Sequence, residues 1–259
     1  MVKTSVVIIT ENEEANIRRC LESVKWADEI IVVDSGSTDI TLDICKEYEC
    51  KVFHREWDGY ANQKNYALDQ ASGDWILSLD ADEEVTSELA KELWQAVNSD
   101  SADAYSIPRL NNFLGRWMRH GGWYPDRQLR FFKRNVGRFK VIPLHECVEI
   151  KDPSVRLGKL SAPLRHYTYQ TVADFIKKAD RYTSIEADAM IKEGRLPKSI
   201  TLSLIMAIPS KFVEVYFYKG GWRDGLHGFI AAVLMSARVF LRYVKLWEAL
   251  GVKNGVKIR

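Results

Sequence analysis

Short apolar runs alternate with amphipathic stretches along the first hundred residues. The apolar runs are typical of parallel strands that are buried on both faces of a sheet. The predicted strands comprise residues 5–10, 29–33, 51–54 and 75–79. Between these runs apolar residues recur at helical spacing, as Ile17, Leu21 and Val24 do, so helices are predicted between the strands. The pattern therefore predicts an α/β domain built from βα units.

Acidic residues follow several of these runs, where the predicted strands end. Asp34 follows the second run, and Asp80 and Asp82 follow the last. Ligands bind at the carboxyl ends of strands in open α/β sheets, and an Asp-x-Asp pair suits a hard divalent cation. The alternative is that the acidic residues belong to ordinary turns and helix starts, with Asn12 as a helix cap and Glu13 in a first turn.

Lys64 lies near the start of a helix that is predicted from Gly59 onward. An exposed cation at that place opposes the helix dipole, which suggests a ligand anion; the alternative is a solvated lysine. The Gly-x-Gly-x-x-Gly and Gly-x-x-x-x-Gly-Lys patterns are absent from the sequence. Neither a dinucleotide-binding fold nor a P-loop is therefore indicated.

The middle of the chain combines two short predicted strands with a segment rich in aromatic residues. Residues 105–108 predict a short strand, and residues 128–133 alternate as a half-exposed strand does. The segment 109–127 between them is predicted to be a loop rich in Asn, Gly, Arg and Trp. Large amphipathic side chains suit a sugar-binding wall, and the alternative is a loop packed on its own aromatic residues. A helix follows, and its expected apolar face comprises Val172, Phe175, Ile176, Ala179 and Tyr182.

The last sixty residues are richer in basic and aromatic residues. Residues 200–208 are apolar and are expected to end at Pro209, and an apolar helix begins at residue 229. Runs of this length are too short for a bilayer of about 30 Å, so we expect the helix to lie in the membrane interface. Its basic face of Arg238, Arg242 and Lys245 would reach anionic head groups. The alternative is packing on the core or on a second subunit.

Composition adds limits to this picture. The 259-residue chain has a formal net charge of +2 and is 46% hydrophobic, enough for one large domain with an appendage. Residues 192–259 contain twelve Lys and Arg against four Asp and Glu, which favours an anionic surface as partner. No nucleic-acid-binding motif is present. The four cysteines lack Cys-x-x-Cys spacing and fit a reducing cytosol.

Four motifs occur in order over about eighty residues. They are Thr10-Glu11-Asn12-Glu13, Asp34-Ser35-Gly36-Ser37-Thr38-Asp39, Lys64-Asn65 and Asp80-Ala81-Asp82. Together they resemble the N-terminal half of an inverting family 2 glycosyltransferase of the GT-A fold. The second motif of that family is usually Asp-Asp-Gly-Ser, and here Ser35 stands at a position from which a uracil contact is often made.

The resemblance implies a fold and a set of nucleotide contacts. The expected fold is a Rossmann-like mixed sheet flanked by helices, the GT-A nucleotide-diphospho-sugar transferase fold, with a helical membrane-associating appendage at the C-terminus. The implied nucleotide-sugar contacts are Thr10 and Glu13 beside the uridine, Asp34 under the base or ribose, Lys64 near the nucleotide, and Asp80 on the ribose or metal side.

The same resemblance implies the metal site and the base. Asp82 would ligate Mg²⁺ or Mn²⁺, and His166 would complete the metal site, although a lone histidine is more often structural. Inverting transfer needs one general base for the acceptor hydroxyl. Glu146, next to His145, is the candidate for that role; the alternative is an edge-strand glutamate with an ordinary pKa.

The whole chain is similar to bacterial lipopolysaccharide-core glucosyltransferases that add β-1,4-linked glucose to inner-core heptose. Residues 1–170 are predicted to form the transferase domain, with a nucleotide-sugar half (1–98) and an acceptor half (99–170), and residues 171–259 the basic and aromatic helical region. The expected partners are a UDP-sugar, a lipid-linked glycan and an anionic membrane surface. The expected location is the cytoplasm, peripherally on the inner face of the cytoplasmic membrane.

Two other functions are compatible with parts of this pattern. A sugar-nucleotidyltransferase also binds nucleotides on an α/β sheet, but the acidic segment 11–14 stands where a basic triphosphate loop would be expected. A catalytically inactive, membrane-bound UDP-sugar-binding protein is the other alternative. The presence of Asp80, Asp82 and Glu146 argues against it.

Overall fold

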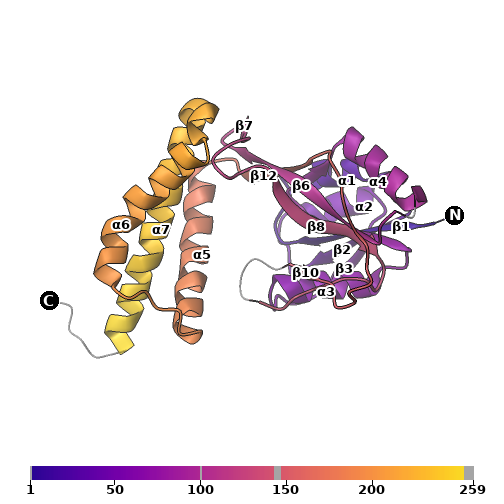
Figure 1. Ribbon diagram of the computed structural model, residues 1–259. Helices are drawn as coiled ribbons and strands as arrows, with labels where there is room; N and C mark the ends of the chain where they lie inside the picture. Colours follow the sequence, from indigo (N-terminus) through magenta and orange to yellow (C-terminus); the bar gives the residue numbers. More distant parts are fainter. Residues whose placement is uncertain (1, 100, 143–146, 254–259) are drawn as a thin grey trace. The chain divides into compact units, whose positions relative to one another are not determined.

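A computed structural model describes residues 2–99, 101–142 and 147–253. The chain divides into two compact units (Figure 1). We call the first, Met1–Leu110 with Pro125–Tyr167, the sheet unit. The second, Asn111–Tyr124 with Thr168–Arg259, is the helical unit.

The sheet has a parallel part and a mixed part. Its strand order is β3-β2-β1-β4-β8-β6-β12-β5. The parallel strands are β1 (Thr4–Thr10), β2 (Glu29–Asp34), β3 (Lys51–His54) and β4 (Trp75–Asp80). The others on this path are β5 (Glu83–Val85), β6 (Ala104–Phe113), β8 (Asp126–Lys133) and β12 (Leu164–Tyr169), while β7 (Arg116–Trp117) and β11 (Leu157–Lys159) pair with β6. A separate pair joins β9 (Arg138–Phe139) to β10 (Val148–Glu149).

Four helices flank this sheet (Figure 1). They are α1 (Ile17–Ser23), α2 (Thr41–Glu47), α3 (Tyr60–Gln70) and α4 (Ser87–Ser99). Successive residues of β1 point to opposite faces, so Ile8 packs in a cluster with Ile17 and Leu21 of α1, whereas Val7 packs with Ala67 of α3. The prediction of parallel strands is confirmed, and β1, β2 and β4 are largely buried, as is the predicted face of α1. The edge strand β3 is mostly exposed, so burial on both faces is wrong for it.

The segment between residues 105 and 133 is more regular than expected. β6 continues to Phe113, and a turn at Leu114 and Gly115, both with positive φ, returns the chain into β7. The predicted loop from 109 to 127 therefore begins as a strand. Arg130 in β8 is only 5% exposed, although the alternating pattern suggested a half-exposed strand.

The helical unit consists of three long helices and two short ones. They are α5 (Val172–Lys192), α6 (Ile200–Phe212), the π-helix η1 (Val213–Tyr218), the 3-10 helix η2 (Gly221–Asp224) and α7 (Gly225–Lys253). Phe175 and Ala179 of α5 are buried as predicted, but Val172 and Ile176 are exposed. The apolar face of α5 is therefore narrower than its sequence suggested.

Pro209 does not end α6, contrary to the sequence-based expectation. α6 continues past it to Phe212, and the wider turns of η1 extend the helix to Tyr218. π-helical turns are rare and occur mostly as single turns inside α-helices. The resulting stretch, Ile200–Tyr218, is 19 residues long and reaches a mean hydropathy of 1.5. Only 11% of the residues in its most apolar window are buried. By length and composition it could cross a membrane, so the expectation that this apolar run is too short is wrong.

The basic face predicted on α7 is directed at α5. Arg238 and Arg242 both form ion pairs with Glu186, and the Lys245 Nζ lies 2.7 Å from the Asp180 Oδ1. The side chains of these three cations are only 18–27% exposed. The expectation that they reach lipid head groups is therefore wrong, because these cations are directed at carboxylates of α5.

Candidate active site

The carboxyl ends of β1, β2 and β4 meet at one edge of the sheet. β1 lies between β2 and β4, and all three strands are parallel. In register, Thr10 lies opposite Asp34 and Ile9 lies opposite Asp80. Three of the predicted nucleotide-sugar residues, Thr10, Asp34 and Asp80, are therefore neighbours at the edge where open α/β sheets bind ligands.

The segment after β1 folds onto the loop after β2 and does not start a helix. Asn12 has a φ of 54°, and its Oδ1 accepts a 2.8 Å hydrogen bond from the backbone N–H of Thr38. The backbone N–H of Glu13 donates to the Thr41 hydroxyl at 2.8 Å. α1 begins only at Ile17. The alternative interpretation of Asn12 as the helix cap is therefore wrong. The Glu13 carbonyl accepts from the backbone N–H groups of Asn16 and Ile17 at 2.9 and 2.8 Å, so Glu13 lies in the turn that leads into α1 and also contacts the start of α2, just after the loop that follows β2.

Asp34 holds the loop after β2 in shape. Its carboxylate is 2% exposed and accepts hydrogen bonds from the backbone N–H groups of Gly36 and Ser37 and from the Ser37 hydroxyl, at 2.5–3.0 Å. Gly36 has a φ of 107°, which favours glycine. The backbone N–H of Ser35 donates to the Thr10 carbonyl at 3.0 Å. The loop is thus fixed before any ligand arrives.

Two buried polar atoms close to this loop have no hydrogen-bond partner within the described part of the chain. They are the Thr10 Oγ1 and the Gln63 Oε1. The amide nitrogen of Gln63 donates to the Ser35 Oγ at 3.1 Å, which places Gln63 beside the same loop. Buried polar atoms are nearly always hydrogen-bonded, so both atoms are candidates to receive polar groups of a nucleotide.

Asp80 is surrounded by cations. Its Oδ1 lies 2.7 Å from the Lys64 Nζ, and its Oδ2 lies 2.7 Å from the Arg130 Nη2. Burial alone would raise the pKa of Asp80, but the positive charges of Arg130, Lys64 and Arg109 outweigh it and hold that pKa well below its usual range. Asp80 is therefore an ionised carboxylate that fixes the positions of two cationic side chains.

Lys64 differs from its expected environment. Its side chain is one of the most deeply buried in the protein, at 1% exposed for the residue, and the ammonium group pairs with Asp80. The alternative of a solvated lysine is wrong. The anion beside Lys64 in the structure is the Asp80 carboxylate. Contact between Lys64 and a nucleotide stays a prediction.

Three further charged residues at the site were missed by sequence reasoning. Glu83 is fully buried; its Oε2 accepts from the backbone N–H of Asp80 at 2.9 Å, and its Oε1 lies 3.3 Å from the Arg109 Nη1. Arg109 also pairs with Asp126 at 2.7 Å. Glu83 directly follows the Asp-x-Asp motif, which was an available signal. Arg109 and Asp126 reach it only through the pairing of β6 with β8, which no local pattern reveals.

Asp82 and His166, the two predicted metal ligands, lie together. The His166 Nε2 is 3.3 Å from the Asp82 Oδ2, and both side chains are largely buried. They meet because β12 pairs antiparallel with β5. In this register His166 lies opposite Glu83, the residue that follows Asp82. The Asp82 carboxylate is the ligand type that Mg²⁺ and Mn²⁺ prefer, whereas the His166 imidazole is a ligand more typical of Zn, Cu, Fe or Ni. No cluster of three or more His, Cys, Asp or Glu occurs among the residues the structure describes. Metal binding by Asp82 and His166 stays a prediction.

Glu146, the predicted general base, lies outside the described residues, which break off at 142 and resume at 147. Its role stays a prediction.

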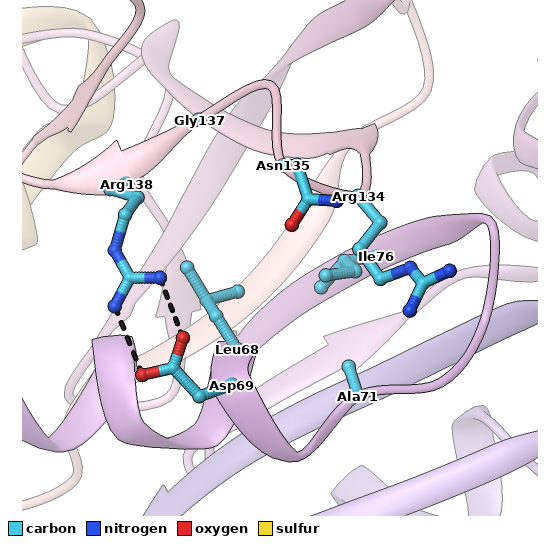
Figure 2. Close-up of a pocket in the computed structure, with 8 residues that line it drawn as sticks. All are labelled: Leu68, Asp69, Ala71, Ile76, Arg134, Asn135, Gly137 and Arg138. Carbon is cyan, nitrogen blue, oxygen red and sulfur yellow. Dashed lines mark hydrogen bonds and ion pairs between the residues drawn. The ribbon is translucent and has the colours of Figure 1, made fainter.

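A cavity of about 210 Å³ lies elsewhere in the sheet unit (Figure 2). It is lined by Leu68, Ile76 and the ion pair between Asp69 and Arg138, whose two N–O distances are 2.6 and 3.0 Å. Ile76 pairs with Ser5 near the amino ends of β4 and β1. The cavity is therefore at the opposite edge from Thr10, Asp34 and Asp80 and is separate from the candidate active site.

Comparison with known proteins assigns this site to a family. Residues 5–148, more than half of the chain, match the family model described as glycosyl transferase family 2. The chain belongs to glycosyl transferase family 2. The resemblance drawn from the four motifs is confirmed, the protein is a glycosyltransferase, and the alternative of a sugar-nucleotidyltransferase is wrong.

Relatives of this glycosyltransferase match nearly its whole length. The lipopolysaccharide core biosynthesis glycosyltransferase LpsC of Rhizobium meliloti (strain 1021) is 32% identical over 96% of this chain and 93% of LpsC. An uncharacterized glycosyltransferase, RT0209, of Rickettsia typhi (strain ATCC VR-144 / Wilmington) is also 32% identical, over 96% of this chain and 88% of that protein. The C-terminal helices thus lie within the matched region.

Among solved structures, the mannosyltransferase PcManGT from Pyrobaculum calidifontis in complex with GDP-Man and Mn2+ has a TM-score of 0.57. It is 15% identical, and the match covers 95% of this chain and 87% of that one. At this identity the likeness concerns the fold alone. Together with the mixed sheet flanked by helices, it confirms the predicted GT-A fold.

Proposed function

We propose that this glycosyltransferase moves a hexose, with glucose as the first candidate, from a UDP-sugar to a lipid-linked glycan with inversion at the sugar. The proposed acceptor is the inner-core heptose of lipopolysaccharide. The likeness to LpsC over nearly the whole chain supports this acceptor class. The observation that carries the proposal is the gathering of Thr10, Asp34 and Asp80 at one sheet edge in a family 2 chain.

The loops after β1 and β2 would hold the nucleoside. Asp34 and Asn12 fix these loops, so the unpartnered Thr10 Oγ1 is presented from a rigid backbone. Glu13, half-buried and held by its backbone to Thr41, would border the uridine. Rigid loops lower the ordering cost of binding.

The cations around Asp80 would orient the diphosphate. Lys64 and Arg130 are held in place by the Asp80 carboxylate, so a phosphate arriving beside them meets positive charge that needs no rearrangement. Asp82 and His166 would hold Mg²⁺ or Mn²⁺. That ion, when bound, neutralises charge on the departing diphosphate.

The acceptor side requires a base, and Glu146 is proposed for it. Its carboxylate would take the proton of the acceptor hydroxyl while the hydroxyl oxygen attacks the sugar from the face opposite the diphosphate. The new bond is oxygen to anomeric carbon, and the broken bond releases UDP. A lipid-linked acceptor also requires the enzyme to work at a membrane, in the proposal peripherally on the cytoplasmic face.

A thermal-shift panel tests the donor. UDP-glucose, UDP-galactose, UDP-GlcNAc, GDP-mannose and nucleoside triphosphates would each be added with and without Mn²⁺. A ligand that binds the folded state raises the unfolding midpoint, so we expect a Mn²⁺-dependent rise with UDP-sugars, largest with UDP-glucose. A rise with GDP-mannose alone would overturn the assignment of UDP. No rise with any donor would favour the inactive-protein alternative.

A further inference from the structure

Large apolar side chains are exposed at one end of the helical unit, around the turn that joins η1 to α7. Phe217, Tyr218, Trp222 and Leu226 are 59%, 85%, 53% and 70% exposed. Four such residues within ten positions are more than the scattered apolar residues of an ordinary surface. Tyr and Trp combine an apolar body with a polar edge, which suits the boundary between water and lipid.

A second segment brings cations to the same turn. The buried Asp224 accepts hydrogen bonds at its Oδ2 from the backbone N–H groups of Arg119 (3.1 Å) and His120 (2.8 Å). The backbone N–H of Gly121 donates to the Lys219 carbonyl at 2.8 Å. We call the surface formed by residues 116–124 and 217–226 the basic-aromatic tip. Its exposed cations are Arg116, Arg119, Lys219 and Arg223.

The tip is rigid because its backbones pack without space between them. A Cβ on Gly228 would lie 1.8 Å from the Gly221 carbonyl oxygen, and a Cβ on Gly221 would lie 2.7 Å from the Val215 carbonyl oxygen. The Arg223 guanidinium lies 5.3 Å from the centre of the Trp222 ring. The backbone that carries the exposed aromatic and cationic groups thus needs little ordering on binding.

The tip also has an excess of positive charge. Asp224 also pairs with Arg116 at 3.7 Å, and Glu214 pairs with Lys211 and Lys219 at 2.9 and 2.5 Å. The two segments carry more cations than these two carboxylates can balance. On α7, in contrast, Arg238, Arg242 and Lys245 are directed at α5 and pair there with Glu186 and Asp180.

We propose that the basic-aromatic tip docks on an anionic phospholipid bilayer, with its aromatic side chains in the interface and its cations at lipid phosphates. Interfacial binding requires apolar area and attraction to anionic lipid on one surface, and the tip has both. Exposed apolar residues of α6, including Leu202 and Ile205, belong to the helix that leads into η1. The inference deepens the proposed function, since it names the surface that would bring the enzyme to a lipid-linked acceptor.

Vesicle co-sedimentation of the full-length protein tests this. Phosphatidylcholine vesicles would be compared with vesicles that also contain phosphatidylglycerol. We expect binding to the anionic vesicles that weakens with salt. The double variant Arg119→Gln/Arg223→Gln should lose about fivefold in binding for each cation removed. Tyr218→Ser/Trp222→Ser should weaken binding to anionic vesicles by a similar factor or more.

Matched controls keep the test specific. Trp94→Ser changes a tryptophan that is 69% exposed on α4, and Arg195→Gln changes an exposed arginine just past the end of α5; both should bind vesicles as the wild type does. Circular dichroism melts would confirm that every variant is folded. Wild-type binding by both tip variants would overturn the proposal, and so would resistance of the wild type to alkaline extraction from membranes, which would indicate that Ile200–Tyr218 spans the bilayer.

Donor binding separates this inference from the proposed function. The tip variants should keep the Mn²⁺-dependent thermal shift with UDP-glucose while they lose vesicle binding. Vesicle binding at the tip without any UDP-sugar shift would contradict the proposed function and leave the docking surface standing. A UDP-sugar shift together with equal vesicle binding by the tip and control variants would contradict the docking surface and leave the proposed function standing.

Discussion

The sheet unit buries charged side chains, whereas the helical unit exposes apolar ones. The sheet unit buries Lys64, Glu83 and Arg130 around Asp80. Each of these three residues is 0–5% exposed. The helical unit leaves Tyr218 and Leu226 in solvent at 85% and 70% exposure. Both arrangements cost stability in water. Each becomes favourable once a partner is present, because preorganised charge suits a diphosphate and exposed apolar residues suit a lipid interface.

Asp82 in the sheet unit has the broadest expected effect, because both donor binding and turnover should depend on it. Asp82→Ala removes the carboxylate that lies beside His166 and should lower turnover by about a thousandfold, since a metal contributes several kcal/mol to charge stabilisation. UDP release in the presence of membrane lipid extract measures this, and the Mn²⁺-dependent thermal shift with UDP-glucose should disappear. Asp43→Ala, at an exposed aspartate of α2, is the control. Normal turnover in Asp82→Ala would remove it from the metal site.

Glu146 separates chemistry from binding. Glu146→Gln should keep donor binding and lower turnover by about 10²- to 10⁴-fold, as expected when a general base is lost. Glu149→Gln, an exposed glutamate three residues further on, should change neither quantity. Equal turnover in Glu146→Gln and Glu149→Gln would assign the base to another residue.

Asp80→Asn tests the cost of the buried charges. Lys64 would lose its carboxylate partner, and the free energy of unfolding at neutral pH should fall by about 3 kcal/mol, as measured by urea denaturation. Asp69→Asn breaks the half-exposed pair with Arg138 and should cost no more than about 1 kcal/mol. Similar losses in both variants would contradict the distinction drawn between buried and exposed pairs.

The same variant predicts a dependence on pH. Neighbouring cations outweigh burial and lower the pKa of Asp80 in the folded state, so its ionised form contributes stability above the unfolded pKa of about 4. That contribution is lost as the pH falls from there toward the lower folded pKa. The wild type should therefore lose more stability than Asp80→Asn on acidification below about pH 4, and parallel curves would count against this.

The smallest effect is expected at Lys245 in the helical unit. Its ammonium group contacts Asp180, whose side chain is 71% exposed. Lys245→Met should therefore cost about 1 kcal/mol or less in unfolding free energy and leave vesicle binding unchanged. A clear loss of vesicle binding would assign membrane contact to the basic face of α7 and not to the basic-aromatic tip.

Local sequence patterns were sufficient for the parallel half of the sheet and for part of the site. The runs at β1, β2 and β4 and the acidic residues after them were found because each signal lies within ten residues of chain. Burial of Lys64 and the pairing of Asp80 with Arg130 were not found, since their partners are 16 and 50 residues away. The local pattern of an alternating strand is the same whether its charged side chain faces water or a buried carboxylate.

The sequence by itself determined the alternating strands and helices of the first hundred residues and the positions of Thr10, Asp34, Asp80 and Asp82 at strand ends, and the resemblance of its four motifs indicated the GT-A fold. The reason is that strand periodicity and parallel pairing place strand ends at one edge. Only the tertiary structure decided that His166 meets Asp82, that Arg238 and Lys245 turn toward α5, and that the chain passes Pro209 as a helix. These outcomes depend on which distant surface each segment packs against, and local periodicity carries no information about that choice.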